Sequence, residues 1–553
     1  MKAGLKKRAH IVECKVDEHV WGLYDVDTGK YLFIDSLDHS LLKCAESVET
    51  RKELESLCAG LPRQSHELNR LNLKKRLDQL FAFGALVEET TKCDGEVLLI
   101  DPPAACEQQV GAKGPAMALC YLSAALEDKG LSPAKILDLR SVSPIIGYDH
   151  PQQAAYFTRY ASQYSPKIIG ITAVSATIEN ALFISRLAKT LYPDSKVVLG
   201  GPHVSYTWED LLAEPSVDVV VRGEGELPFP RVVERILNHT RGVLDFSDIP
   251  GASWRDGAGK AVSTGWSPGV ECLDNIRVPD VYDGLLNRGD YAIESLHVMS
   301  SRGCPFTCSF CSTATFTGRR VRYRSAKSVL TELEYYYHRY GLGTFVFDDD
   351  IFTVNRKRTL ELCGAIESLP FMSELRWGCN TRLDCIDNDI IDALYRAGCR
   401  HILFGVESGD IDVQTRFAKG KRGLDGFQHK IERLLELGIV PDLNFIIGLP
   451  GEDKESIAKI GTLITNFPEV PCAFNFLAIL PGTPLERQMA ELGISFVGAD
   501  NKSRYSMTAP TVNTPTMSYE GQIKAFMDLQ WFRQRTSVAR KRQKNAQLSE
   551  VYA

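Results

Sequence analysis

The middle of the chain alternates short apolar runs with amphipathic segments. Between residues 95 and 240, the apolar runs EVLLIDPP, AKILDLR, IIGITAV, KVVLGGP and VDVVVRGEGE alternate with stretches that have the spacing of helical faces. Buried strands joined by helices indicate a parallel sheet that is covered on both faces. We therefore expect a doubly wound, Rossmann-like α/β domain whose ligands bind beyond the carboxyl ends of the strands.

A second alternation runs from about residue 294 to residue 485. Its six strand-like segments are SLHVMSSRG, GTFVFDDDIF, LRWGCNTR, HILFGVESG, VPDLNFIIGLPGE and CAFNFLAILPGTP. Strands of this kind followed by helical patterns predict a partial (β/α)6 barrel, with its chemistry at the carboxyl ends of the strands. The stretch between the two alternations is rich in Gly, Pro, Asp and Trp, and we expect it to be a linker.

The N-terminal stretch begins with two strand-like runs around Asp27, Thr28 and Gly29, which is a hairpin signal. Helical spacing follows, and Gly84 ends it before a short strand. This order of elements and the phrase DVDTGKYLFI resemble the winged-helix modules that present precursor peptides to modifying enzymes. A plain structural cap is the alternative.

These patterns divide the chain of 553 residues into five parts. Single cores rarely grow beyond about 250 to 300 residues, so several domains are expected. We expect a winged-helix, peptide-recognition-like module over 1–92, a Rossmann-like domain over 93–244, a linker over 245–290, a barrel over 291–488 and a small C-terminal region with a final helix over 489–553.

Charge and hydropathy exclude some classes of partner. The net charge is −6, so no global positive field draws the chain to nucleic acid or to an anionic membrane. The basic run from Arg533 to Lys544 is interpreted as a solvated helix face or a frayed tail. No apolar run reaches the length of a membrane span, and the first residues lack the apolar segment of a signal peptide, which predicts a cytoplasmic protein.

Three of the 15 cysteines stand together in SRGCPFTCSFC, at Cys304, Cys308 and Cys311. The other twelve lie singly, as small buried hydrophobic residues do. The C-x3-C-x2-C spacing lets one loop wrap three thiolates around a 4Fe-4S cluster and leaves one iron open for an exchangeable ligand. A zinc site usually needs four protein ligands, and no second C-x2-C lies nearby. Zinc and three inert cysteines stay as alternatives.

The phrases that follow the cysteines resemble the radical S-adenosylmethionine (SAM) superfamily. An aromatic residue precedes the last cysteine, and the phrases FDDD, NTR, GVESG and GLPGE follow in the superfamily's order. The resemblance implies a 4Fe-4S cluster and SAM, with these residues near SAM: Phe310, Asp349, Arg382, Glu407 and Ser408. The carboxylate, amine and ribose of SAM call for residues of these types. One aspartate of the tandem Asp348 to Asp350 is alternatively a helix cap.

The phrases GITAVSAT, VVLGGPH and RGEGE resemble the cobalamin-binding domains fused upstream of one branch of that superfamily. The resemblance implies cobalamin bound by Thr172, Ser175, Thr177, Gly200, Gly201, Pro202, Gly223 and Glu224. Glycines permit close approach of the backbone to a large flat ligand. The axial-histidine phrase D-x-H-x-x-G is absent, because the corresponding loop reads DPPAACEQQVG. We expect a displaced benzimidazole and cobalt without a histidine ligand, with His203 a loop residue.

Together the resemblances imply a class B radical SAM methyltransferase that moves a methyl group from SAM through methylcobalamin to an unactivated or weakly nucleophilic carbon. A natural-product intermediate is expected as substrate, either a small molecule such as an amino acid or a peptide. The tryptophan 2-C-methyltransferases of thiopeptide pathways are similar. An external electron donor of the flavodoxin or ferredoxin type is implied, and no catalytic residue is assigned. The alternatives are a radical cyclase or oxidase with the same cofactors, and a cofactor-sensing binding protein.

Overall fold

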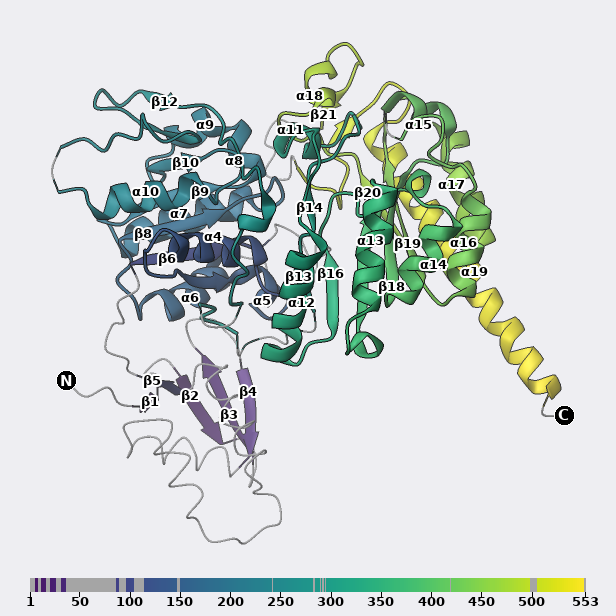
Figure 1. Ribbon diagram of the computed structural model, residues 1–553, viewed down its shortest axis with the longest axis horizontal. Helices are drawn as coiled ribbons and strands as arrows, with labels where there is room; N and C mark the ends of the chain where they lie inside the picture. The colour runs from purple at the N-terminus through teal and green to yellow at the C-terminus, as the bar shows by residue number, and fades with distance from the viewer. Residues whose placement is uncertain are drawn as a thin grey trace, which may run out of the picture.

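Two α/β bodies lie side by side in the computed structural model, with the first strands of the chain below one body and the last helix beyond the other (Figure 1). The structure describes residues 96–103, 114–146, 150–240, 242–281, 284–288, 290, 293, 295–417, 419–497 and 505–551, and five short strands before residue 89.

The N-terminal strands form two small antiparallel sheets. β1 (Leu5–Lys7) pairs with β5 (Leu86–Glu88), and β2 (Ile11–Lys15), β3 (Val20–Asp25) and β4 (Tyr31–Asp35) pair in chain order. Tyr24 lies opposite Tyr31, which confirms the hairpin predicted around Asp27 to Gly29. The predicted helices of this module lie outside the described residues.

The first α/β body contains a seven-stranded sheet in the order β12-β11-β10-β9-β8-β6-β7. Its parallel part confirms the predicted doubly wound fold and consists of β6 (Val97–Asp101), β7 (Lys135–Asp138), β8 (Ile168–Thr172), β9 (Lys196–Gly200) and β10 (Val219–Val221). One face packs against α4 (Met117–Asp128) and α10 (Pro228–Leu237). The other face packs against α5 (Leu139–Ile146), α6 (His150–Ala161), α7 (Ile178–Leu191), α8 (Pro202–Tyr206) and α9 (Trp208–Ala213).

The stretch 245–290, expected as a linker, also contributes to this sheet. β11 (Ala252–Arg255) pairs antiparallel with β10, β12 (Ala261–Ser263) pairs antiparallel with β11, and the short helix η1 (Leu273–Asn275) follows. The turn between the strands is closed by Asp256, whose carboxylate accepts the backbone N–H groups of Ala258 and Lys260. Two strands of three or four residues around a polar turn are too short to give a visible hydrophobic period.

The second body is a six-stranded parallel sheet in the order β13-β16-β17-β18-β19-β20. All six predicted segments form its strands: β13 (Leu296–Val298), β16 (Thr344–Phe347), β17 (Arg376–Thr381), β18 (Cys399–Glu407), β19 (Val440–Ile447) and β20 (Cys472–Phe476). The helices between them are α12 (Ala326–Tyr340), α13 (Arg356–Glu367), α14 (Asn388–Arg396), α15 (Ile411–Phe417), α16 (Phe427–Glu436) and α17 (Lys454–Asn466). The partial barrel is confirmed.

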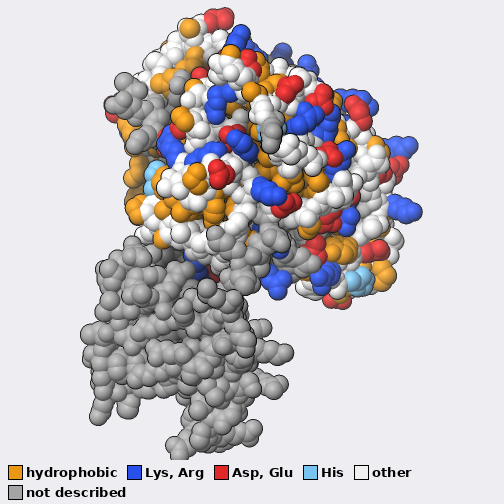
Figure 2. Space-filling model, turned by 90° about the vertical axis from the view of Figure 1, so that its left-hand side faces the viewer, with side chains coloured by type: hydrophobic (Ala, Val, Ile, Leu, Met, Phe, Trp, Pro, Cys, Tyr) orange, Lys and Arg blue, Asp and Glu red, His pale blue; other side chains and the backbone are white. Residues whose placement is uncertain are grey.

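Several short elements and one long C-terminal helix complete this body. They are β14 (Ser301–Arg302), α11 (Thr313–Phe316), β15 (Arg322–Tyr323), η2 (Met372–Glu374), η3 (Leu383–Cys385), α18 (Pro484–Gln488), β21 (Ser495–Phe496), β22 (Val512–Asn513) and the predicted final helix α19 (Tyr519–Val551). None of the helices in the described ranges combines the length and the apolar composition of a membrane span. Acidic and basic side chains are interspersed over the described part of the face in Figure 2.

One apolar core is shared by the two bodies. It contains residues of α4 and α10 from the first body and continues through β13 into α12 of the second. A buried polar contact crosses the same seam, because the Tyr121 hydroxyl on α4 donates to Glu332 Oε1 on α12 at 2.8 Å. Glu332 is also paired with Arg324, and both side chains are almost fully buried. The two bodies therefore pack as one unit.

A buried carboxyl joins the ends of β18 and β19. Glu452 accepts hydrogen bonds from Ser408 Oγ at 2.7 Å, Gly448 N at 2.9 Å and Leu449 N at 3.2 Å. Its side chain is fully buried, and this burial raises its pKa to about 8. Glu452 thus fixes two of the strand ends at which barrel chemistry is expected.

Replacing Glu332 with alanine would leave the Arg324 charge buried without its main partner. We expect Glu332→Ala to lower the free energy of unfolding by about 3–5 kcal/mol. The matched control is Glu334→Ala on the exposed face of the same helix, where a change below about 0.5 kcal/mol is expected. Urea unfolding of both variants is the measurement, and equal losses would contradict a structural role for the buried pair.

The raised pKa of Glu452 predicts a pH-dependent stability. Between pH 4.5 and about 8 the folded chain holds a proton that the unfolded chain has lost, so this group makes the fold less stable as pH rises through that window. The glutamine of Glu452→Gln cannot ionise. As pH rises through the same window, the melting temperature of this variant should therefore increase relative to that of the wild type. The control is Glu455→Gln at an exposed position of α17. A difference that stays constant with pH would refute the prediction.

Candidate active site between the two sheets

A cavity of about 350 Å³ lies between the two bodies. The first sheet contributes the carboxyl ends of β8, β9 and β10, through Thr172, Gly200 and Gly223. The second body contributes Asp350 after β16 of its parallel sheet, and Arg302 at the end of β14, which forms a separate antiparallel pair with β15. Parallel strands from both sheets therefore end at one cavity, where ligands of such folds bind.

Six of the eight residues predicted for cobalamin line this cavity: Thr172, Gly200, Gly201, Pro202, Gly223 and Glu224. Ser175 and Thr177 are not among its lining residues. The Ser175 hydroxyl is hydrogen-bonded to His203 Nδ1 at 2.9 Å, and Thr177 Oγ1 accepts the backbone N–H of Val174 at 3.1 Å. Both hydroxyls therefore stabilise the loop between β8 and α7.

Glycine occupies two adjacent positions at the cavity, 200 and 201, for different physical reasons. Gly201 has a φ of +112°, and a Cβ there would lie 2.7 Å from the carbonyl oxygen of Ala173. The tight turn after β9 therefore requires Gly201. Gly200 has no positive φ, and the nearest neighbour of a Cβ there would be the carbonyl oxygen of Val221, at 3.9 Å. The backbone does not need glycine at Gly200, so the open space is suited to a ligand that approaches the chain closely.

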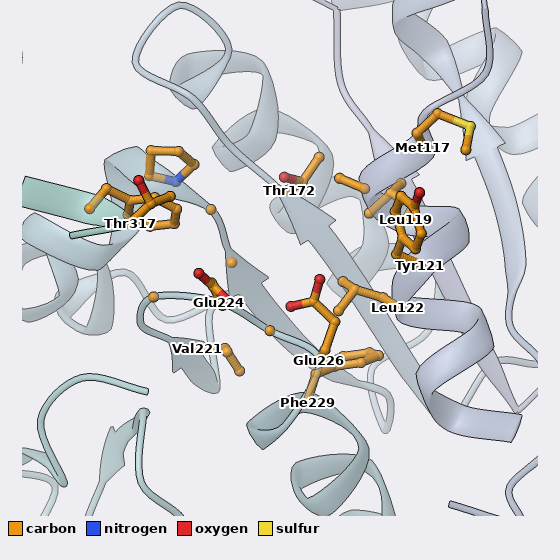
Figure 3. Close-up of a pocket in the computed structure, with 18 of the residues that line it drawn as sticks. Met117, Leu119, Tyr121, Leu122, Thr172, Val221, Glu224, Glu226, Phe229 and Thr317 are labelled. Carbon is orange, nitrogen blue, oxygen red and sulfur yellow. The ribbon is translucent and has the colours of Figure 1, made fainter. Parts of the chain in front are cut away.

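The cavity extends into an apolar slot between the sheet and its two covering helices. Met117 and Leu122 on α4 and Phe229 on α10 line this slot, as Figure 3 shows. Gly170 in β8 also lines it, and a Cβ there would lie 2.6 Å from Leu99 Cδ2. An apolar slot beside a glycine-lined strand end fits cobalamin, which has a large flat ring and a tail with an aromatic base.

One histidine lies at the cavity and another lies away from it. His203 is buried at the start of α8 against Ser175 and Tyr505, and burial lowers its pKa to about 4. His297 in β13 lines the cavity, and its Nδ1 lies 2.8 Å from Asp348 Oδ2. Sequence reasoning missed this pair, because the contact follows from the pairing of β13 with β16 and from no local motif.

The three clustered cysteines lie on the loop between β14 and β15, and all are half-buried thiols. The loop is held because the backbone N–H and the hydroxyl of Ser309 both donate to the Phe417 carbonyl, at 2.9 and 3.0 Å. Burial raises the pKa of Cys304 to about 11, and the charges of Asp350 and of the other two thiols add to the rise. Within the described ranges no three potential ligands converge on a single metal ion. A cubane cluster does not require this, since each thiolate binds a different iron.

Positive side chains surround the cysteine loop. Arg382 Nη1 lies 3.9 Å from Cys308 Sγ, and its guanidinium stacks on Phe306 at 3.6 Å and pairs with Asp384 at 2.6 Å. Lys419 Nζ lies 3.0 Å from Glu407 Oε1. Burial raises the pKa of Cys308, and the charges of Lys419 and Arg382 oppose that rise. Lys419 belongs to no motif that sequence reasoning used.

Ser408, Phe310 and Asp349, the remaining residues predicted for SAM, contact other parts of the protein. Ser408 donates to Glu452, and Phe310 packs on the apolar cluster that contains Phe417. Asp349 is fully buried and accepts hydrogen bonds from Ser300 N at 2.6 Å and Ser301 Oγ at 2.5 Å, which fixes the chain just before the cysteine loop.

The neighbouring aspartate faces the cavity instead. Asp350 is a lining residue, accepts the Gly303 N–H at 3.1 Å, and has its pKa raised to about 6 by burial. The tandem aspartates therefore divide between holding the loop and lining the cavity.

Comparison with known families matches both bodies. Residues 108–233 match the B12 binding domain, and residues 298–464 match the radical SAM superfamily. The B12 binding domain binds cobalamin, and radical SAM domains hold a 4Fe-4S cluster and SAM. These three are therefore the cofactors of the chain.

Curated relatives and solved structures share both parts. An uncharacterized methyltransferase of Pyrococcus horikoshii is 30% identical over 70% of this chain and 82% of its own. The anaerobic magnesium-protoporphyrin IX monomethyl ester cyclase of Cereibacter sphaeroides is 28% identical over 74% of this chain and 65% of its own. The radical SAM methyltransferase TsrM of Kitasatospora setae has a similar fold, with a TM-score of 0.63 and 19% identity over 79% of this chain and 91% of its own. Another structure of TsrM contains its tryptophan substrate and a SAM analogue.

The fold, the shared cavity and these matches agree with one another. The chain belongs to the cobalamin-dependent radical SAM enzymes, in the class of the radical SAM methyltransferases.

Proposed function

We propose that the chain transfers a methyl group from SAM, by way of cobalamin, to an unactivated or weakly nucleophilic carbon of a natural-product intermediate. The cavity between the sheets is the observation that carries this proposal. Its walls combine the glycine-lined strand ends of the first body with residues that adjoin the cysteine loop of the second. A substrate between them would meet both cofactors in a space enclosed by protein.

Each part of the site has a proposed task. Cys304, Cys308 and Cys311 bind the cluster, and Gly200 and its neighbours at the cavity bind cobalamin. Phe310, Asp349, Arg382, Glu407 and Ser408 contact or position SAM. When bound, the cluster supplies an electron, SAM supplies the methyl group and cobalamin carries it.

The charges around the loop suit an anionic cluster and a zwitterionic ligand. Arg382 and Lys419 place two positive groups beside Cys308, and they favour its thiolate. The Glu407 carboxylate, already paired with Lys419, can accept a hydrogen bond from an amine or a ribose hydroxyl. The half-buried position of the loop limits access of water to the cluster.

The substrate class is a small molecule or a peptide. Tryptophan is one candidate, since TsrM, which has a similar fold, binds it as substrate. The strands of residues 1–92 support a peptide-recognition module and hence a peptide candidate. Reduction of the cluster calls for an external donor of the flavodoxin or ferredoxin type.

Radical cyclisation with the same cofactors is the second candidate. The cyclase of Cereibacter sphaeroides, 28% identical over 74% of this chain, favours it. The methyltransferase of Pyrococcus horikoshii aligns over more of its own length, and it favours methyl transfer.

Methyl-labelled SAM tests the proposal directly. The chain is reconstituted anaerobically with iron, sulfide and hydroxocobalamin, reduced, and incubated with tryptophan, other amino acids and precursor peptides. We expect S-adenosylhomocysteine and labelled methyl groups on cobalamin and on one acceptor, as measured by mass spectrometry. Release of 5′-deoxyadenosine without S-adenosylhomocysteine would support the cyclase. Label on neither cobalamin nor any acceptor, with both cofactors bound, would refute methyl transfer.

Gly200 gives a test of the cobalamin site that needs no substrate. A leucine there would fill the cavity while the backbone keeps its conformation, because Gly200 has no positive φ. We expect Gly200→Leu to weaken hydroxocobalamin binding at least about tenfold, or about 1.4 kcal/mol, in an absorbance titration. Gly364→Leu is the matched control, at an exposed position of α13 with open space around it. Equal affinities for both variants would place cobalamin elsewhere.

A further inference from the structure

Two arginines stand at the two ends of the cysteine loop. Arg302 ends β14, just before Gly303 and Cys304, and Arg322 begins β15. The two short strands pair antiparallel, with Arg302 opposite Arg322. The loop that carries all three clustered cysteines therefore starts and finishes at this pair.

The carboxylates that bind these arginines come from the other body. Glu224 Oε2 accepts hydrogen bonds from Arg302 Nη1 at 3.0 Å and from Arg322 Nη1 at 3.1 Å. Glu226 Oε1 accepts from Arg302 Nη2 at 2.5 Å. We call these four side chains the Glu–Arg clamp. Both glutamates follow β10, in the RGEGE phrase of the cobalamin-binding domain.

The Glu–Arg clamp is buried, with side chains between 8% and 12% exposed. Burial alone would raise the pKa of Glu224, but the Arg322 hydrogen bond and the charge of Arg302 outweigh it, and the pKa is lowered. The glutamate is therefore ionised at neutral pH. Separating buried and ionised partners is unfavourable, so the two sides of the clamp should move together.

The clamp also forms part of the cavity wall. Glu224, Glu226 and Arg302 line the cavity beside Gly223 and Gly225, the glycines of the same loop. A group seated against these glycines would fix both glutamates. The glutamates would in turn fix the strands at the base of the cysteine loop.

Arg322 takes part in the clamp from outside the cavity. It is not among the lining residues, and its guanidinium donates to Glu224, which lines the cavity, and to the Val270 carbonyl, which does not. A change at Arg322 can therefore alter the clamp without altering the surface that a cofactor would touch.

We propose that the Glu–Arg clamp couples the two cofactor sites, so that cobalamin in the cavity and a cluster on the cysteine loop each strengthen the binding of the other. The four clamp side chains act as positioning residues. This inference rests on the proposed placing of cobalamin in the cavity. Coupling between two sites is reciprocal, and typical couplings change affinity by about 5- to 150-fold.

Hydroxocobalamin affinity with and without the cluster measures the coupling. Full-length chain reconstituted with iron and sulfide is compared with a variant in which Cys304, Cys308 and Cys311 are all alanine. We expect the cluster-loaded chain to bind hydroxocobalamin about fivefold more tightly or better. The opposite direction is followed through the rate of cluster loss to an iron chelator, which hydroxocobalamin should slow in the wild type.

Arg322→Gln tests whether the clamp carries the coupling. We expect this variant to bind hydroxocobalamin with nearly the same affinity with and without the cluster, and Arg322→Lys to retain part of the difference. Glu271→Gln is the matched control, because Glu271 pairs with Arg320 on the surface, where both side chains are at least 73% exposed. It should keep the full wild-type ratio.

The outcomes separate this inference from the proposed function. Failure of the wild type to bind hydroxocobalamin would refute the cobalamin site itself. If the wild type binds hydroxocobalamin with equal affinity in the presence and absence of the cluster, only the coupling is refuted. The role of the clamp is refuted if Arg322→Gln keeps the wild-type ratio of these two affinities. Should Arg322→Gln not fold, the chelator measurement on the wild type decides, since no effect of hydroxocobalamin on cluster loss would overturn the proposal.

Discussion

Burial of charge at the seam between two sheets is the constraint on which the rest of the structure depends. Arg302, Arg322 and Arg324 are all buried beside the cysteine loop, and each is matched by a glutamate. Guanidinium groups removed from water need such partners, and two of these pairs join segments from different bodies. Matched charges therefore align the strand ends of both sheets around one cavity.

The fold follows from the sequence wherever apolar runs are long enough to show a period. The six barrel strands and the parallel strands of the first sheet were all predicted from such runs. β11, β12, β14 and β15 were not, because their sequences ASWR, AVS, SR and RY contain few large apolar residues and they pair across a polar turn or a long loop. Pairing of this kind depends on tertiary contacts rather than on local preference.

The candidate site is predictable only where its residues stand at the ends of predicted strands. Motif residues at strand ends, such as Gly200 and Arg382, come to the cavity or to the cysteine loop because parallel strands end at one edge. Ser175 has a suitable side chain, but its hydroxyl is engaged by His203. His297 and Lys419 carry no motif, and their partners lie 51 and 12 positions away in the chain. Only the order of strands and the folded loops bring these pairs together.

The apolar core shared by α4, β13 and α12 has a consequence for how such enzymes can diverge. Each body has an apolar surface at the seam that the other body covers. Replacing one body with the equivalent part of a distant relative would therefore expose hydrophobic side chains. Substitutions on α4 and α12 would have to be compensated across the seam. Changes in substrate preference are therefore easier to acquire in the loops and in the outer segments than by recombining whole modules.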